Sequence, residues 1–478
     1  MHINDLPSDI LQDIFYMHVY LYCQPRKPLL RTCRRWYTVA TNHSLLWRTI
    51  SLWNKKESPP VNVECHNLNA LARVISRTGT ATFDFCLGLP YHDPQEEEIQ
   101  LFVDSVDGSW LSRCRSFILE APQSPWRVPD SGALGNLLKQ YSYNSLEHIQ
   151  VESSDRKMWE HMLESMMYRV EETSLNLRSL EITFGNESTG INKSILQRTR
   201  VLERIRSLNL FLVNQSISWT DFPNLERLEI SYSRAIDTSN INELTAPGLT
   251  HLTLHEHFWG HNLPREVFPQ LQHLTLNYFT YDEDMEPLAL PNLLSLAFFR
   301  TNIDLEFFEA PKLEELVFKV DPYDEGCYEY PLLADATFSP RVLRLDIIPS
   351  SDDAELGEPL YLWRRMEELH LTAFEEDSLA ETSLLEAISG ETKEGCFPAL
   401  RVLTILYPSG ETSQGPSQET KERTMGEARA ILKARLVAGL KPLEQLRVGW
   451  YWTNDDDNVL EDSSREWWVT MWEDCLEG

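Results

Sequence analysis

Histidines gather in one short stretch of the chain. His251, His255, His257 and His261 are four of its 13 histidines, and they fall within 11 residues. Imidazole nitrogens are common zinc ligands, so three of these side chains could hold a zinc ion. No cysteine or carboxylate completes a familiar ligand set, although Glu256 lies between two of the histidines. A zinc centre is therefore one hypothesis for this stretch, and a polar surface is the other.

Catalytic signatures would be the next sign of chemistry. The sequence contains no Gly-x-Ser-x-Gly elbow, no Gly-x-Gly-x-x-Gly turn, no Walker-type loop and no His-Glu-x-x-His pair. We therefore expect no enzyme activity, no catalytic residue and no cofactor. An enzyme with an unrecognised site would need titratable groups that converge in a pocket, and the sequence gives no sign of them.

The elements expected to carry the histidines belong to a repeat that recurs along the chain. The phrase Pro-x-Leu-x-x-Leu-x-apolar begins at seven prolines, namely Pro223, Pro247, Pro269, Pro291, Pro311, Pro340 and Pro398. The first five prolines are 24, 22, 22 and 20 residues apart. Periods of about 20–29 residues with this leucine spacing are typical of leucine-rich repeats. At Pro340 we assign the apolar positions to Val342, Leu345 and Ile347.

Each phrase predicts a short strand with one apolar face. In Leu-x-Leu both leucines point to the same side of the strand, and each unit must stack on its neighbours to bury them. The spacing extends back without proline to Phe83/Phe85 and forward to Leu443/Leu446/Val448, which makes about 14 strand units. Longer repeats with helices run to about residue 215, and shorter repeats follow. The expected fold is α/β, with a curved leucine-rich repeat solenoid over residues 54–450.

The alternation also predicts which side chains face away from the core. His251 and His255 flank Leu252 and Leu254, so we expect them on a solvent-facing or partner-facing surface rather than around a metal. In leucine-rich repeat proteins the concave face often binds the partner, and solvated surface is the alternative. Alternating charges favour a protein ligand over a phosphate. The candidate substrate-facing residues are Arg227, Glu229, His251, His255, His273, Asn277, Phe299 and Lys319.

The first fifty residues have helical rather than repeat spacing. Asp5 or Ser8 is a suitable cap for a helix in which Pro7 occupies the first turn. Ile10/Ile14 and Leu11/Phe15 are i,i+4 pairs that share one face. A second helix is expected from Pro28 through Ala40, and a third apolar turn from Leu45 through Ile50. Three such short helices make a poor core alone, so the module needs a partner or the rest of the chain.

The order of these residues resembles the F-box, a small helical module that docks proteins onto a ubiquitin ligase. The resemblance covers about a tenth of the chain, and it depends on Leu6-Pro7, the run Cys33-Arg34-Arg35-Trp36 and Leu46-Trp47. It departs from the family between Met17 and Leu30, where two prolines replace the usual helix start. The resemblance implies docking to a Skp-type adaptor through Leu6, Pro7, Ile10, Leu11, Ile14, Phe15, Cys33, Trp36, Leu46 and Trp47. An ordinary helical cap of the solenoid is the alternative.

Charge is distributed unevenly along the chain. The net charge is −30, yet residues 1–56 have eight basic and three acidic residues, so they carry +5 and the remainder carries −35. General nucleic-acid binding needs a positive footprint, so we expect no nucleic-acid partner. The basic N-terminal region could steer an acidic protein toward it, and Skp-type adaptors are acidic as a family. Solvation of helix faces is the alternative role for these residues.

Eight cysteines occur without a Cys-x-x-Cys pair, so we expect reduced thiols in a reducing compartment. The N-terminus lacks the basic and apolar regions of a signal peptide, and no 18-residue apolar run predicts a membrane helix. We therefore expect no membrane partner and a cytoplasmic or nuclear location, or both.

The C-terminal end differs in composition from the repeats. Residues 407–423 look flexible, and residues 425–437 have the spacing of a helix. Residues 453–478 contain nine acidic residues and one arginine. Because Trp468/Trp472 and Trp467/Met471 are i,i+4 pairs, we expect a capping helix there, with a docking peptide as the alternative. The expected domains are an F-box at 1–53, the solenoid at 54–450 and an acidic, Trp-rich cap or tail at 451–478.

Together these features suggest a substrate-recognition adaptor of an SCF-type cullin–RING ubiquitin ligase. The F-box would bind a Skp-type adaptor and through it a cullin, and the repeats would bind an unknown protein substrate. Irregular repeats after a short F-box resemble the F-box families of mushroom-forming fungi. The alternative is a repeat scaffold that uses an F-box-like cap internally and never joins a ligase.

Overall fold

The computed structural model describes most of the predicted strands and helices of the chain. The described residues are 3, 6–21, 26–52, 63–65, 68–88, 108–120, 138–153, 156–184, 199–211, 222–231, 246–255, 269–277, 288–299, 305–319, 339–348, 365–373, 388, 397–408, 418–451 and 465–471. They form two compact units, Met1–Gly248 and Leu249–Gly478.

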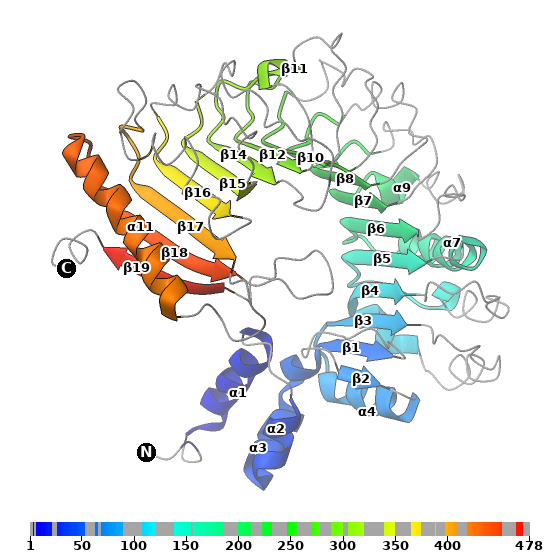
Figure 1. The fold of residues 1–478 in the computed structure, drawn as a ribbon. Helices are drawn as coiled ribbons and strands as arrows, with labels where there is room; N and C mark the ends of the chain where they lie inside the picture. The colour runs from blue at the N-terminus through cyan, green and yellow to red at the C-terminus, as the bar shows by residue number, and fades with distance from the viewer. Residues whose placement is uncertain are drawn as a thin grey trace. The chain divides into compact units, whose positions relative to one another are not determined.

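The first unit begins with helices and continues as a parallel sheet (Figure 1). Its helices are α1 (Ser8–Tyr16), the π-helix η2 (Met17–Leu21), α2 (Lys27–Thr32), α3 (Arg34–Asn42), the 3-10 helix η3 (Ser44–Trp47), α4 (Leu68–Thr78), the 3-10 helix η4 (Gly108–Arg113), α7 (Arg156–Thr173) and α9 (Thr199–Leu202). Its strands are β1 (Thr49–Leu52), β2 (Val63–Cys65), β3 (Phe83–Gly88), β4 (Cys114–Glu120), β5 (His148–Ser153), β6 (Ser179–Phe184), β7 (Ser207–Phe211) and β8 (Arg227–Ser231). β1 pairs in parallel with both β2 and β3, and the later strands follow in chain order.

The second unit is a parallel sheet that ends in one antiparallel strand. Its strands are β9 (His251–His255), β10 (His273–Asn277), β11 (Leu288–Ala289), β12 (Ser295–Phe299), β13 (Phe308–Glu309), β14 (Glu315–Lys319), β15 (Val342–Ile348), β16 (Glu368–Ala373), β17 (Val402–Pro408), β18 (Gln445–Tyr451) and β19 (Arg465–Met471). Its helices are the 3-10 helix η7 (Leu305–Phe307) and α11 (Gln418–Val437). Short strands β11 and β13 pair separately. In each unit the stacked strands resemble a leucine-rich repeat solenoid.

Leucine columns run across each sheet and form its core. In the first unit Leu180, Leu208 and Leu228 are aligned on adjacent strands. In the second unit the aligned and fully buried set is Leu252, Leu274, Leu296, Leu316, Leu343, Leu369, Leu403 and Leu446. Every leucine phrase noted in the sequence lies on or leads into one of these strands. Burial of each aliphatic side chain contributes about 1.5–3 kcal/mol, so the columns stabilise the stacked strands.

Backbone hydrogen bonds keep the strands in phase although the repeats differ in length. The amides of Glu226 and Arg227 both donate to the Arg206 carbonyl oxygen, and the same paired bond recurs at most later repeats. Equivalent positions are 20 residues apart at Arg206 and Glu226 but 43 apart at Arg401 and Glu444. The backbone hydrogen bonds at the start of most strands are therefore the same from repeat to repeat, and the connecting segments differ in length.

Asparagines at the strand entry strengthen this stacking. The Asn224 side-chain amide donates to the Glu203 carbonyl oxygen at 2.6 Å, and Asn292 donates to the Pro269 carbonyl oxygen at 2.7 Å. The sequence lacks the usual asparagine after the last leucine of each repeat. Asparagine before the first leucine instead reaches back to the preceding repeat.

The repeat beginning at Pro340 has a different register from the predicted one. Leu343 pairs with Leu316, and Leu345 pairs with Phe318, so the pair aligned with the leucine columns is Leu343/Leu345 rather than Leu345/Ile347. Pro340 itself is buried and occupies the position that a leucine takes in the other repeats. Period-two spacing fits both registers, and pairing with β14 selects the one that buries Leu343.

The predicted C-terminal capping helix is wrong. Arg465–Met471 forms β19, which pairs antiparallel with β18 so that Trp468 lies opposite Val448. Tryptophan, valine and threonine favour strands, and β18 would otherwise leave a row of unpaired backbone groups at the sheet edge. The strand therefore covers that edge. The helix expected at 425–437 is present in α11, but it begins at Gln418, inside the segment expected to be flexible.

The N-terminal helices also differ in detail from their prediction. Pro7 is the N-cap residue of α1 rather than part of its first turn, and no side chain caps that end. The expected second helix is divided at Cys33, which is extended (φ −159°, ψ 168°) between α2 and α3. Ile50 lies on β1, so the helical region leads directly into the sheet. No helix among the described residues is long and apolar enough to cross a membrane.

Candidate interaction surfaces

The N-terminal helices enclose a small core of their own. Phe15 of α1 packs on Trp36 of α3 with ring centroids 4.9 Å apart. Trp47 donates its Nε1–H to the Ala40 carbonyl oxygen at 3.0 Å, and the Arg77 guanidinium lies 4.5 Å from its ring centre. Since Arg77 belongs to α4, these contacts fasten the helices to the first repeat.

Four of the ten predicted adaptor-binding residues belong to this core. Leu11 and Phe15 are 0% exposed, Leu46 is 1% exposed and Trp47 is 3% exposed. In the chain alone, these four side chains hold the helices together. Their direct contact with an adaptor stays a prediction.

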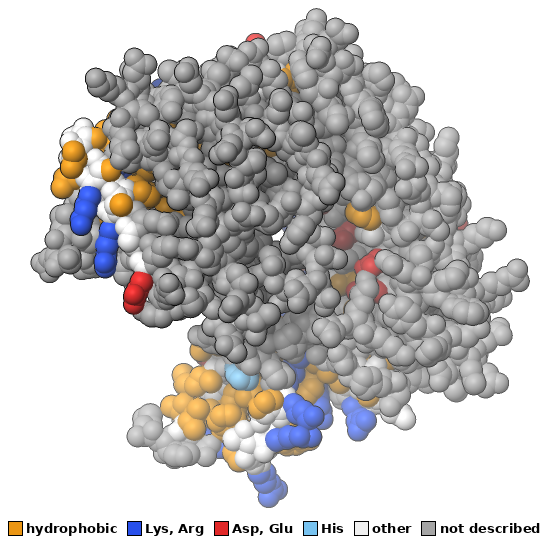
Figure 2. All heavy atoms as spheres, viewed as in Figure 1, with side chains coloured by type: hydrophobic (Ala, Val, Ile, Leu, Met, Phe, Trp, Pro, Cys, Tyr) orange, Lys and Arg blue, Asp and Glu red, His pale blue; other side chains and the backbone are white. Residues whose placement is uncertain are grey.

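The other six predicted residues keep exposed surface. Pro7 and Ile10 are exposed, and Leu6, Ile14, Cys33 and Trp36 are half-buried. Further exposed apolar side chains on the same helices are Ile3, Met17, Leu21, Tyr37 and Leu45. Figure 2 shows hydrophobic side chains gathered over these helices, with lysine and arginine beside them. A gathering of exposed apolar side chains with a polar rim is typical of a protein-binding surface.

Met17 and Leu21 are outside the predicted adaptor-binding set, but the sequence carries a signal for both. Ile10, Ile14, Met17 and Leu21 follow one another at steps of four, three and four residues, which is one continuous helical stripe. The stripe continues because the π-helix η2 extends α1 directly. This apolar stripe therefore extends beyond the residues of the F-box motif, as far as Leu21. We refer to Pro7, Ile10 and Met17, which are exposed, together with the half-buried Ile14 and Trp36, as the apolar surface.

Cys33 positions Trp36 on this surface. The Trp36 backbone N–H donates to Cys33 Sγ at 3.5 Å, so the thiol caps the start of α3. The Arg35 guanidinium donates to the Leu6 carbonyl oxygen, which fastens α3 to the residue before Pro7. These contacts connect the Leu-Pro and Cys-Arg-Arg-Trp pieces of the motif, which are 29 residues apart.

Arg26 holds the segment in which the sequence departs from the F-box pattern. Its Nε–H donates to the Leu46 carbonyl oxygen at 2.6 Å, and its Nη2 donates to the Tyr20 hydroxyl at 3.2 Å. Burial lowers the pKa of this guanidinium, and the nearby Tyr20 opposes that shift. Charge-assisted hydrogen bonds of Arg26 thus link η2 to η3.

The candidate substrate-facing residues lie on the sheet face opposite the leucines. In the first unit, Arg227 and Glu229 alternate with buried Leu228 and Ile230 on β8. Glu229 accepts a hydrogen bond from Asn209 at 3.2 Å. Burial raises the pKa of Glu181 on the same face, and Glu229 and Glu152 raise it further. This part of the face is therefore polar and acidic.

The other six residues lie on four strands of the second unit. The His251 and His273 rings stack with centroids 4.3 Å apart, and Asn277 hydrogen-bonds His255 Nδ1 at 2.9 Å. Phe299 and Lys319 continue the row of Asn277. Among the described residues, no three side chains of histidine, cysteine, aspartate or glutamate come together in a group that could hold a metal ion. His257 and His261 lie outside the described residues.

Replacing His251 and His255 together with alanine should leave the stability of the chain nearly unchanged. Both side chains are on the face opposite the leucine columns, and surface substitutions usually change the free energy of unfolding by about 0.5 kcal/mol or less. Thermal unfolding with and without a chelator would check this. A large loss of stability in both the variant and the chelated chain would instead indicate a metal site.

Acid should destabilise the fold through its half-buried histidines. Burial lowers the pKa of His148, against smaller opposing effects of Gln150 and Asp84, and burial also lowers the pKa of His43 and His370. The unfolded chain then binds more protons, since free histidine titrates near about 6.5. Stability is greatest above that pH and falls as the pH drops toward the folded pKa values. The melting temperature should therefore fall between pH 7.5 and 5.5, less steeply for His148→Gln; an equal slope would contradict the assignment.

Comparisons with known proteins agree with the N-terminal features. A family model described as F-box-like matches residues 3–53. No curated protein matches the chain. Among solved structures, an internalin (inlF) from Listeria monocytogenes str. 4b F2365 is similar over 62% of this chain and 75% of its own, with 14% identity and a TM-score of 0.30. A TM-score of this size does not establish a shared fold.

Proposed function

We propose that the chain is a substrate-recognition adaptor of an SCF-type cullin–RING ubiquitin ligase. The F-box-like helices would dock a Skp-type adaptor and through it a cullin, and irregular leucine-rich repeats would hold a protein substrate. The observation that carries the proposal is the coincidence of the F-box-like match at residues 3–53 with the apolar surface. The proposed plan, irregular repeats after a short F-box, resembles the F-box families of mushroom-forming fungi.

The proposed mechanism is proximity rather than chemistry. A substrate held on the sheet face would stay near a conjugating enzyme carried by other subunits, which raises the effective concentration of the reacting groups. The chain itself would act without a catalytic residue or cofactor. It would work in the cytoplasm, the nucleus or both, where ubiquitin ligases operate.

Charge supports the same division of roles. Residues 1–56 carry +5, and the exposed residues of α2 and α3 include Lys27, Arg31, Arg34 and Arg35. A positive rim around an apolar centre favours an acidic partner and raises its association rate. The remainder of the chain carries −35, which disfavours nucleic acid as the second partner.

A scaffold outside any ligase is the second candidate. It is favoured by the burial of Leu11, Phe15, Leu46 and Trp47, and by the Arg77 contact that joins Trp47 to the first repeat. Under this alternative the helices are a cap for the sheet, and their exposed apolar side chains bind no adaptor.

Binding to a purified Skp-type adaptor separates the two candidates. The double variant Pro7→Ala/Trp36→Ala should bind about 30-fold or more weakly than the intact chain, since truncating apolar residues at an interface centre costs about 2 kcal/mol or more. Titration calorimetry would measure the dissociation constants. Ile10→Asp, at a residue that is 42% exposed, should give the same loss without touching the Phe15–Trp36 contact.

Leu175→Ala is a matched control for these variants. Leu175 is 76% exposed and lies beyond the F-box-like residues, so its truncation should leave adaptor binding unchanged. Failure of the intact, folded chain to bind the adaptor would favour the scaffold.

A further inference from the structure

One row of the second sheet combines two arginines with a histidine and a threonine in an acidic chain. Arg344, His370, Thr404 and Arg447 are aligned on the adjacent strands β15, β16, β17 and β18. Each lies between two buried aliphatic residues, so all four share the face opposite the leucine columns. Adjacent strands are about 4.8 Å apart, so the row is about 14 Å long. We call these four residues the basic row.

Thr404 is buried within the basic row, and its hydroxyl has no hydrogen-bond partner among the described residues. Its side chain is 2% exposed, and no described residue bonds its Oγ1. Next to it, His370 Nε2 lies 3.7 Å from the nearest Glu368 oxygen, beyond normal hydrogen-bond length. Buried polar atoms are nearly always paired, so two unpaired atoms side by side point to a group that is not part of the described residues.

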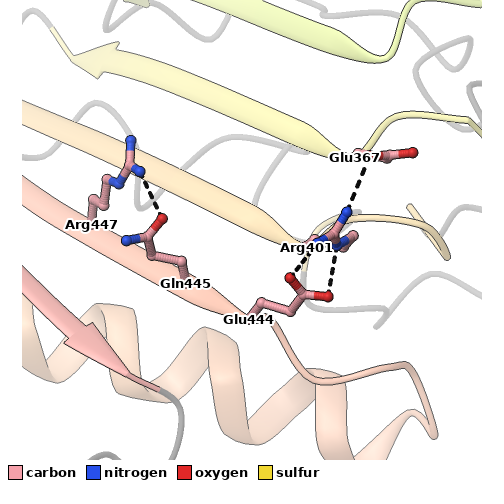
Figure 3. Close-up of polar contacts among 5 residues, drawn as sticks. All are labelled: Glu367, Arg401, Glu444, Gln445 and Arg447. Atoms are coloured by element: carbon pink, nitrogen blue, oxygen red, sulfur yellow. Dashed lines mark hydrogen bonds and ion pairs between the residues drawn. The ribbon is translucent and has the colours of Figure 1, made fainter.

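Arg447 has no carboxylate partner among the described residues. It donates to the neutral Gln445 side chain at 2.7 Å (Figure 3). Arg401 on the neighbouring repeat shows the contrast, since it binds Glu444 through two bonds of 2.7 and 2.5 Å and also reaches Glu367 (Figure 3). Arg344 is paired with Glu315 at 2.8 Å, through a single nitrogen. Among the described residues, the charge of the Arg447 guanidinium is therefore not neutralised by a carboxylate.

We propose that the basic row binds an anionic side chain, a phosphoryl group or a carboxylate, on a segment of the partner protein. Thr404 and His370 supply neutral donors for its oxygens, and Arg447 and Arg344 supply charge from either side. A free phosphate ion is shorter than the row, whereas a peptide crossing the strands can also contact neighbouring positions. The inference rests on the proposed role of this sheet face in binding a protein.

Fluorescence anisotropy with three peptide pools tests the proposal. The pools are randomised among neutral residues and differ only at the central residue, which is phosphoserine, glutamate or serine. The intact chain should bind the phosphoserine pool, the glutamate pool or both, and not the serine pool. Binding of phosphoserine alone would identify a phosphoryl group as the ligand, and comparable binding of both would identify any acidic side chain.

Variants of the basic row make the test specific. Arg447→Gln and the near-isosteric Thr404→Val should each weaken binding by about tenfold, as expected for losing a charge-assisted bond or a buried donor. Arg401→Gln removes the same charge outside the row and should bind as the intact chain does. Circular dichroism melts would show that each variant is folded.

Two results would overturn the proposal. One is equal binding of all pools, or of none up to millimolar concentration. The other is binding that appears only after Asp455, Asp456 and Asp457 are changed to asparagine, because the chain's own acidic segment would then be the occupant. Either result leaves adaptor docking by the N-terminal helices untouched, since no Skp-type adaptor is present in the assay.

Discussion

Leu252→Asp is expected to lower the free energy of unfolding of the second unit by several kcal/mol. Leu252 is 2% exposed and is aligned with Leu274 in the leucine column. An aspartate there would place an unpaired charge between stacked strands, among the costliest single changes in a protein. Thermal and urea unfolding followed by circular dichroism would measure the loss.

Thr253→Asp provides the matched control for this prediction. Thr253 is the next residue on β9, and its half-buried side chain is on the opposite face of the strand. The same new charge should therefore change stability by about 0.5 kcal/mol or less. An unchanged unfolding transition for Leu252→Asp, or equal effects of both variants, would refute the repeat register.

Trp47→Ala is expected to destabilise the N-terminal helices by about 3–5 kcal/mol, the usual cost of truncating a large core aromatic. Trp47 is 3% exposed, donates to the Ala40 carbonyl oxygen at 3.0 Å and carries the Arg77 guanidinium on its ring. The variant loses the packing, the hydrogen bond and the cation–π contact together. Limited proteolysis of the N-terminal residues and thermal unfolding would both report the change.

Leu45→Ala tests whether this effect comes from burial. Leu45 lies two residues away and is 42% exposed, so its truncation should cost much less stability. If Trp47→Ala kept full stability and resistance to proteolysis but lost adaptor binding, Trp47 would be a contact residue and the described core would be wrong.

The strands and their core could be predicted from the sequence because their signal is local and repeated. Leu-x-Leu spacing determines which side chains are buried whatever the length of the connecting segment. Pro340 shows the limit of this reasoning, since two registers fit the same residues and only pairing with β14 distinguishes Leu343 from Ile347. β1 and β2 were missed because neither carries the leucine phrase.

The candidate surfaces were less predictable because they depend on contacts between distant residues. The motif gave the order of Leu46 and Trp47 but not whether they face inward or outward. The break at Cys33 depends on its backbone conformation, which the continuous spacing of Leu29, Cys33 and Trp36 conceals. At the C-terminus, the i,i+4 spacing of tryptophans suggests a helix. The segment instead forms a strand, because it pairs with the open edge of β18.

The sequence carries a signal for the basic row. Arg344, His370, Thr404 and Arg447 occupy the same position, between the last two apolar residues of four successive phrases, once Pro340 is set in its observed register. The proline at the start of the phrase conceals this alignment, because Pro340 stands three residues before Leu343. The polar atoms without partners, however, could be found only in the structure.

The mass of a complex in solution tests the central claim most directly. The chain would be mixed with a Skp-type adaptor and the adaptor-binding part of a cullin, and the mixture measured by size-exclusion chromatography with light scattering. The account predicts one species that contains all three proteins in equal numbers, and its loss with Ile10→Asp. Elution of the intact, folded chain alone, apart from an adaptor–cullin pair, would contradict the account.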